Sequence, residues 1–192
     1  DLIESGLVSV NGELARIADP SLRLHHHSAL SADKRRRLHA RAAEVHAGKY
    51  PATHLWHRSF LHPHGQDGIR LIDAAADLAG SGDPASAVEF AERGLREGGD
   101  PAERGRALVE LGDALVRHGH FVLGQHYLRR AGSVAEPHLR ARSALAQLRA
   151  AAVVDHVVDD ALVEEVLPGI PAEDAESLLI EAARYRLNRG EL

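Results

Sequence analysis

The sequence predicts an all-α fold built from repeated helical hairpins, and three observations lead to that prediction. Hydrophobic residues make up 44% of the chain and aromatic residues only 4%, so the core consists mainly of Ala, Leu and Val. That composition favours closely packed helices over strands, which prefer β-branched and aromatic residues. Breaks that contain Gly or Pro separate helix-length segments after residue 66, and the pattern of apolar and small residues recurs at an interval of 37 positions.

The first residues differ from the rest of the chain. Asn11-Gly12 lies between two short β-capable runs, and both residues tolerate positive φ, so we expect a short β-hairpin with a type I′ turn. Pro20 can occupy the first turn of a helix that ends near Leu30, because its missing N–H costs nothing there. Ser31 is placed to cap a second helix, which we expect to stop at Gly48.

From Gln66 onward, segments of about 12 to 17 residues with helical character alternate with turns of about 2 to 5 residues. Connections of this length indicate antiparallel helix pairs. We expect the breaks at residues 80–84, 98–101, near 119, at 136–137 and at 168–171.

Two of these pairs share one register. The matching positions are Leu71, Ala74, Ala75, Leu78, Gly82, Ala87, Ala91 and Gly94 in the first pair and Leu108, Leu111, Gly112, Leu115, Gly119, Gly124, Leu128 and Ala131 in the second. Ala75 with Ala87, and Gly112 with Gly124, are small residues on opposite sides of each turn, so the two helices of a pair can approach closely. This pattern resembles the tetratricopeptide repeat, with aliphatic residues at the family's aromatic positions, and the resemblance implies a right-handed superhelix.

A third unit keeps Leu145, Leu148, Ala152 and Ala161 in register but has Arg149 and His156 where small residues are expected. A fourth unit begins with Leu179 and ends before its second helix. The chain also has no Met and opens in the middle of a pattern, so we expect a fragment of a longer protein in which the array continues. We expect residues 1–47 to form a separate first part that includes a linker helix, and residues 48–192 to form the helical array, truncated at its C-terminal end.

Composition excludes several classes of function. A net charge of −5 argues against a nucleic-acid-binding surface, and the absence of Cys excludes disulfides, thiolate metal sites and Cys nucleophiles. No apolar run approaches the roughly 18 residues that a membrane span needs, so we expect a cytoplasmic protein.

Histidines are the most prominent chemical feature, with 14 in the chain. His25, His26 and His27 would fan around a helix axis, so they cannot converge on one ion, and we interpret them as helix surface. His54, His57, His62 and His64 are closer to a site, since the first two share a helix face and Asp67 could add an oxygen. Their spacing fits no known zinc pattern, so we interpret them as solvent-facing, and metal-dependent hydrolysis remains a third hypothesis.

No catalytic motif is present. A G-x-S-x-G elbow is absent, and Ala43 stands where a phosphate-binding loop ending at Lys49 needs Gly. The basic run at residues 35–37 is most simply a solvated helix face. We therefore predict a protein that is not an enzyme, with no catalytic, cofactor-binding or metal-binding residues in this segment.

Residues 6–45 resemble a junction in the large ATP-binding transcriptional regulators of the LuxR type, which belong to the signal-transducing NTPases with numerous domains. The resemblance rests on Gly6-Leu7-Val8, on Pro20, Leu22 and Arg23, and on Arg36-Arg37-Leu38-His39. Beyond the junction, Thr53-His54-Leu55-Trp56-His57 is similar to the segment that follows it in the family. Asp19 replaces a motif His that in the family could lie near the nucleotide. The resemblance implies a winged-helix tail, an ATP-binding loop upstream, and a DNA-binding helix-turn-helix downstream, both outside this segment.

These observations predict a sensor and coupling segment that binds a protein or peptide, a small-molecule inducer, or another part of its own chain. The first helix of each pair would line the groove of the array. The predicted partner-binding residues are Ile72, Asp73, Val109, Glu110, Asp113, Gln147, Ile180 and Arg184. The alternative is a freestanding helical-repeat scaffold unrelated to transcription.

Overall fold

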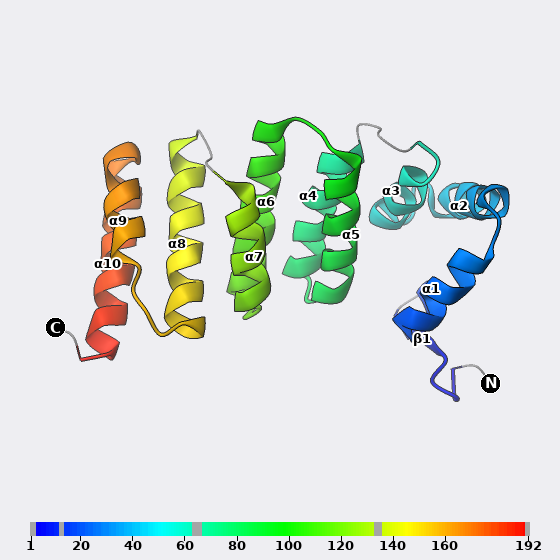
Figure 1. Cartoon of the computed structure of the whole chain (residues 1–192), viewed down its shortest axis with the longest axis horizontal. Coiled ribbons are helices and arrows are strands. Elements are labelled where there is room, and N and C mark those ends of the chain that lie inside the picture. The colour runs from blue at the N-terminus through cyan, green and yellow to red at the C-terminus, as the bar shows by residue number, and fades with distance from the viewer. Residues whose placement is uncertain (1–2, 12–13, 63–66, 133–135, 191–192) are drawn as a thin grey trace. The chain divides into compact units, whose positions relative to one another are not determined.

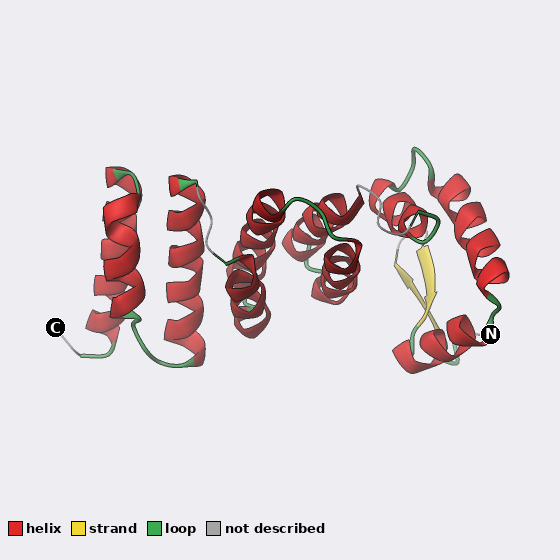
Figure 2. Cartoon of the chain, turned by 45° about the horizontal axis from the view of Figure 1, so that its top comes forward, coloured by secondary structure: helices red, strands yellow, loops and turns green. Residues whose placement is uncertain are grey.

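The computed structural model describes residues 3–11, 14–62, 67–132 and 136–190. These residues form ten α-helices, one 3₁₀ helix and two short strands, so the predicted helical fold class is confirmed (Figure 2). The chain divides into two compact units, Asp1–Leu61 and His62–Leu192, which we call the first and second units. In the described ranges, no helix combines the length and apolar character needed to cross a membrane.

The first unit contains strands β1 (Val8–Asn11) and β2 (Leu14–Ile17) and helices α1 (Pro20–Ala29), α2 (Ala32–His46) and α3 (Pro51–Ser59). The strands pair antiparallel, with Val8 opposite Ile17 and Asn11 opposite Leu14. Gly12 lies outside the described residues, so the type of the connecting turn stays a prediction.

Local capping explains where α1 and α2 begin and end. The Asp19 carboxylate accepts the backbone N–H of Ser21 at 2.7 Å, and Pro20 occupies the first helical position as predicted. The Ser31 hydroxyl accepts the N–H of Lys34 at 3.4 Å, which confirms the predicted cap of α2. Gly48 has a φ of 76° just after that helix, where a residue with a side chain would be strained.

The division between the units differs from the boundary predicted after residue 47. Helix α3 packs against α2 and belongs to the first unit. Leu55 of α3 and Ala43 of α2 are both buried, and His54 Nδ1 lies 2.8 Å from the Ala43 carbonyl oxygen. Burial against α2 therefore places α3 with the helices before it.

The second unit is helical throughout its described residues. Its elements are α4 (Asp67–Gly80), α5 (Pro84–Glu97), α6 (Pro101–Arg117), α7 (Phe121–Ala131), α8 (Pro137–Val154), α9 (Asp160–Val166), the 3₁₀ helix η1 (Leu167–Gly169) and α10 (Ala172–Asn188) (Figure 1). All five predicted breaks are confirmed. A sixth break, between α8 and α9, was not predicted, because it contains neither Gly nor Pro.

The two helices of a hairpin approach closely where glycines leave no room for a side chain. A Cβ built on Gly112 would lie 3.1 Å from the Gly124 carbonyl oxygen, and one built on Gly124 would lie 2.8 Å from the Gly112 carbonyl oxygen. This confirms the predicted approach of α6 to α7. In α4 and α5, Ala75 and Ala87 are fully buried, as predicted for that pair.

A second close contact joins Gly68 of α4 to Gly94 of α5. A Cβ on Gly94 would lie 2.5 Å from the Gly68 carbonyl oxygen, and one on Gly68 would lie 2.9 Å from the Gly94 carbonyl oxygen. The helices α4 and α5 therefore approach closely at Gly68 and Gly94, a contact that the repeat pattern did not predict.

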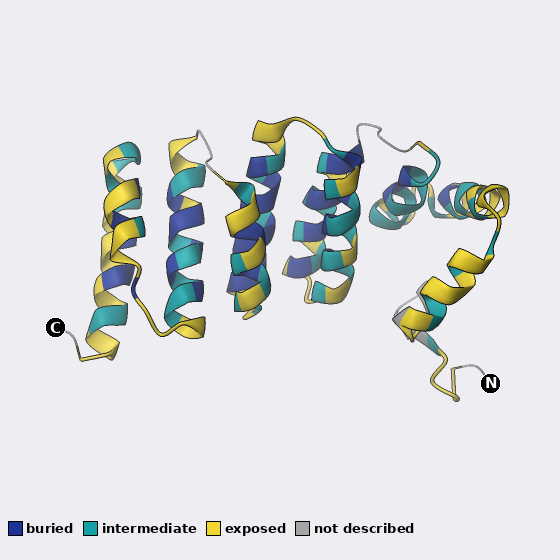
Figure 3. Cartoon of the chain, viewed as in Figure 1, coloured by how far each residue is buried: buried dark blue, intermediate teal, exposed yellow. Residues whose placement is uncertain are grey.

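The core runs through α4, α5, α6 and α7 and continues to α10. Figure 3 shows the buried positions of these helices on the sides where they meet. Ile72, Leu108, Leu111 and Leu115 anchor the cluster of the first two hairpins, and Leu148 and Leu178 anchor the one between α8 and α10. Since α4 contacts α6, α6 contacts α8 and α8 contacts α10, the first helices of successive hairpins are neighbours.

Candidate functional site

Charged side chains join the first helices of successive hairpins. Asp73 of α4 pairs with Arg106 of α6, Asp113 of α6 pairs with Arg142 of α8, and Arg149 of α8 pairs with Glu181 of α10. Each seam between first helices thus has an arginine–carboxylate contact. We call this surface the arginine–carboxylate face, defined by Asp73, Arg106, Glu110, Asp113, Arg117, Arg142, Arg149, Glu181 and Arg184.

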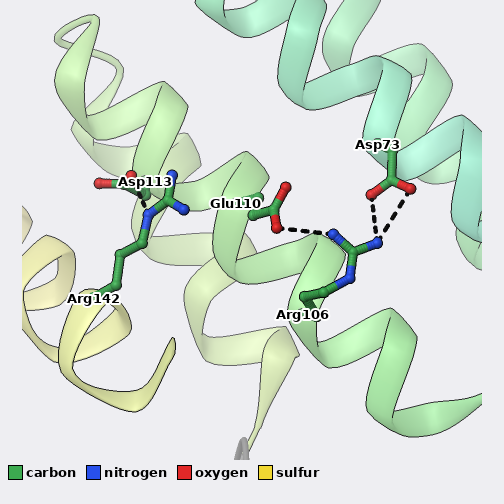
Figure 4. A network of polar contacts seen from close by, with 5 residues as sticks. All are labelled: Asp73, Arg106, Glu110, Asp113 and Arg142. Carbon is green, nitrogen blue, oxygen red and sulfur yellow. Dashed lines mark hydrogen bonds and ion pairs between the residues drawn. The ribbon is translucent and has the colours of Figure 1, made fainter. Parts of the chain in front are cut away.

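At the α4–α6 seam, one arginine serves two carboxylates (Figure 4). Arg106 Nη2 donates to both Asp73 oxygens at 3.0 and 3.2 Å, and its Nη1 donates to Glu110 Oε1 at 2.8 Å. Desolvation acts to lower the pKa of Arg106, but the hydrogen bonds and charges of Glu110 and Asp73 outweigh it and raise the pKa. The guanidinium is therefore held charged and oriented by two neighbours.

The other two seams have the opposite stoichiometry, since one carboxylate serves two arginines. Asp113 Oδ2 accepts from Arg142 Nε at 2.7 Å and lies 3.3 Å from Arg117 Nε. Glu181 Oε1 accepts from Arg149 Nε at 3.0 Å, and its Oε2 lies 3.5 Å from Arg184 Nη1. Both carboxylates are nearly buried, while all four arginines reach solvent.

A shallow groove of about 470 Å³ opens on this face. Its wall comes from α4, α6 and α8 and includes Asp77, Glu110, Arg117 and Arg142, with Ala76, Gly80, Ser81 and Ala114 between them. The lining therefore combines small residues with charged ones, an arrangement suited to a chain segment that lies across three helices.

The predicted partner-binding residues divide into two groups. Asp73, Glu110, Asp113 and Arg184 lie on the arginine–carboxylate face. Gln147 is half-buried and donates to Ser143 Oγ at 3.0 Å, whereas Ile180 is exposed on α10.

The partner-binding role predicted for Ile72 and Val109 is wrong. Both have no exposed surface, and Ile72 belongs to the core cluster of the first two hairpins. Each directly precedes a residue of the face, and neighbouring positions on a helix point about 100° apart, so one faces the groove and the other the core. No partner can reach these two side chains in this fold.

Five residues of the face were missed: Arg106, Arg117, Arg142, Arg149 and Glu181. A local signal existed for three of them. Arg106 stands four residues before Glu110, Arg117 stands four residues after Asp113, and Glu181 stands three residues before Arg184. These are the spacings of ion pairs on one helix face. The contacts between helices leave no such local signal, because their partners are about 30 positions apart.

The first unit brings histidines from all three of its helices together. His39 Nε2 lies 3.3 Å from His27 Nε2, and His39 Nδ1 lies 2.9 Å from His57 Nδ1. His39 also stacks on Phe60, with ring centroids 4.0 Å apart. Burial lowers the pKa of His57, helped by the positive charges of His46 and His54, and burial with Arg35 lowers the pKa of His27.

This arrangement differs from a metal centre. The two nitrogens of His39 face different histidines, so the rings form a chain and do not point at one position. Over the described ranges, no group of three or more His, Asp or Glu residues is arranged to hold a metal ion. His54 and His57 have different partners, His62 is exposed, and His64 lies outside the described residues.

Comparison with known proteins adds no identification, since no protein-family model, curated protein or solved structure matches the chain significantly.

Proposed function

We propose that the chain is a non-catalytic sensor and coupling segment that binds a peptide, a protein surface or another part of its own longer chain along the groove of α4, α6 and α8. The observation that supports this proposal is the groove itself, whose lining combines small residues with charged side chains, of which Glu110, Arg117 and Arg142 are held by ion pairs. Charged side chains that are already oriented lose little entropy when a partner binds.

In this proposal the hairpins form a right-handed superhelix of tetratricopeptide-like units, and the first unit is the tail of a winged-helix module. The backbone contacts of Gly112 with Gly124 and of Gly68 with Gly94 support the first part, because close helix pairs are the building units of such arrays. The paired strands β1 and β2, followed by α1 and α2, support the second.

The link to transcription rests on the resemblance to LuxR-type regulators. ATP and DNA would then bind to domains outside this chain, and a small-molecule inducer is a further candidate for the groove. The coding sequence on both sides of the segment tests this. A phosphate-loop motif upstream with a helix-turn-helix downstream supports the regulator, whereas a sequence without either motif supports the freestanding scaffold.

The function of the groove is tested with Asp77→Lys in the regulator that we propose. Asp77 lines the groove, and among the described residues it takes part in no inter-helix ion pair, so its replacement changes the charge of the groove without opening a seam. Glu110 and Asp113 are less suitable, because both hold arginines. We expect Asp77→Lys to reduce induced reporter transcription at an unchanged protein level. Glu165→Lys on the exposed surface of α9 is the matched control, and equal transcription from both variants counts against the groove.

A further inference from the structure

The arginine–carboxylate face is electrically asymmetric. Over α4 and the adjoining side of α6, Asp73 and Glu110 pair with Arg106, and Asp77 lines the groove beside Glu110. Over α6, α8 and α10, the two carboxylates Asp113 and Glu181 hold four arginines. Counting formal charges, one region has three negative groups and one positive group, and the other has two negative and four positive groups.

The excess arginines are accessible and held in place. Arg142 and Arg149 donate to their carboxylates through Nε. A guanidinium has five N–H donors, so further donors remain for a second acceptor. The side chains of Arg117, Arg142, Arg149 and Arg184 are 54%, 42%, 35% and 68% exposed, while Asp113 and Glu181 are only 11% and 12% exposed. A ligand therefore meets arginines whose orientation is already fixed from below.

The geometry of α8 sets the spacing of the two sites. Arg142 and Arg149 are two helical turns apart on one side of α8, which separates their backbone positions by about 10 Å. A peptide in an extended polyproline-type conformation advances about 9 Å over three residues and returns its side chains to the same side. Carboxylates three residues apart on such a peptide match this spacing, and arginine binds carboxylates with good geometry.

We propose that the region of the face over α6, α8 and α10 binds an extended acidic segment of a protein partner, in which two carboxylates three residues apart each contact one arginine pair. This inference deepens the proposed function and rests on it. A long polyanion such as nucleic acid fits less well, because the acidic region over α4 would repel its continuation. That region instead suits a neutral or basic residue at the other end of the same segment.

The test uses the full 192-residue chain and fluorescently labelled peptides, with binding followed by anisotropy. The probe contains a Glu-x-x-Glu motif; the controls carry Gln-x-x-Gln or place the two Glu residues side by side. We expect the probe to bind at least tenfold more tightly than either control, and its affinity to fall as salt is added. Equal affinity for all three peptides overturns the proposal.

Two double variants show whether the arginines are responsible. Arg142→Gln with Arg149→Gln removes one arginine from each carboxylate and leaves Arg117 and Arg184 in place, so neither acid is left without a cation. Arg117→Gln with Arg184→Gln removes the more exposed members instead. Each pair should weaken the probe at least tenfold with unchanged far-ultraviolet circular dichroism, whereas the matched pair Arg96→Gln with Arg129→Gln, on α5 and α7, should not.

The outcomes separate this inference from the proposed function. One outcome is that a neutral or basic peptide binds, that the acidic probe does not, and that Asp77→Lys abolishes the binding. This result would overturn the proposal of an acidic partner but would keep the groove as a binding site. If the Arg96/Arg129 control loses as much probe binding as the other two pairs, the peptide does not bind specifically at the arginine–carboxylate face. That result also overturns the proposal.

Discussion

Gly124→Ala tests whether bare backbone contact holds the α6–α7 hairpin together. The added Cβ would lie 2.5 Å from Val116 Cγ2 and 2.8 Å from the Gly112 carbonyl oxygen. Ordinary contacts are about 3.5 to 4 Å between carbon atoms, and a backbone carbonyl cannot rotate out of the way. The two helices must therefore move apart by several tenths of an ångström, against the packing on both sides.

Two opposing effects set the magnitude. Overpacking of this kind costs typically about 1–3 kcal/mol. Replacing Gly by Ala inside a helix returns about 1 kcal/mol through propensity. We therefore expect the free energy of unfolding to fall by up to about 2 kcal/mol, and to lie about 1–3 kcal/mol below that of a Gly→Ala change without the clash, measured by urea denaturation with far-ultraviolet circular dichroism.

Gly80→Ala is the matched control, because a Cβ there meets nothing within 4 Å and its φ is not positive. That substitution should leave stability unchanged or raise it by up to about 1 kcal/mol. If Gly124→Ala were as stable as Gly80→Ala, the helices would not be in contact at Gly124, and the reasoning about close hairpins would be refuted.

Three further predictions concern charged and titrating groups. Burial, with Glu92, raises the pKa of Tyr127 from 10.0 to about 12. The neutral phenol therefore stabilises the fold fully below pH 10.0, and this stabilisation is lost as the pH rises towards 12. Phenolate absorbance should show Tyr127 ionising above pH 10.0, and ionisation at pH 10.0 would contradict the prediction. Burial lowers the pKa of His57 from 6.5, so the neutral imidazole stabilises the fold above pH 6.5 and this stabilisation is lost as the solution is acidified. When the pH is lowered from 6.5, the urea concentration at the midpoint of unfolding, followed by Trp56 fluorescence, should decrease. The decrease should be smaller in His57→Gln. Asp113→Asn keeps the volume but removes the charge between Arg117 and Arg142, which should cost about 1–2 kcal/mol in urea denaturation, while Asp77→Asn should cost nothing measurable.

The helical hairpins were predictable because their signals are local. Gly and Pro mark the breaks at residues 80–84 and 98–101, and small residues mark the contact of Gly112 with Gly124. The break between α8 and α9 gave no such signal. There His156 adopts a φ of 55°, a left-handed conformation that is uncommon outside Gly, and Asp159 caps α9 by accepting from Leu162 N–H at 3.0 Å.

The candidate site was predictable only in part. Helical periodicity placed Asp73, Glu110 and Asp113 on one side of their helices but could not tell that side from the adjacent core positions Ile72 and Val109. Contacts between helices depend on how far each hairpin is rotated and shifted against the next. That information lies in the packing of the whole unit, so the arginine partners and the histidine chain of the first unit emerged only with the structure.

The hairpins and the seams between them are held by different kinds of force. Within a hairpin, glycine backbones touch, and such contacts permit no sliding. Between the first helices of hairpins, Arg142 and Arg149 bridge to nearly buried carboxylates through Nε and keep their other donors towards solvent. An acidic partner that binds those other donors therefore leaves the contacts across the seams in place. Such a partner would add a second layer of contacts over the same seams that already join one hairpin to the next.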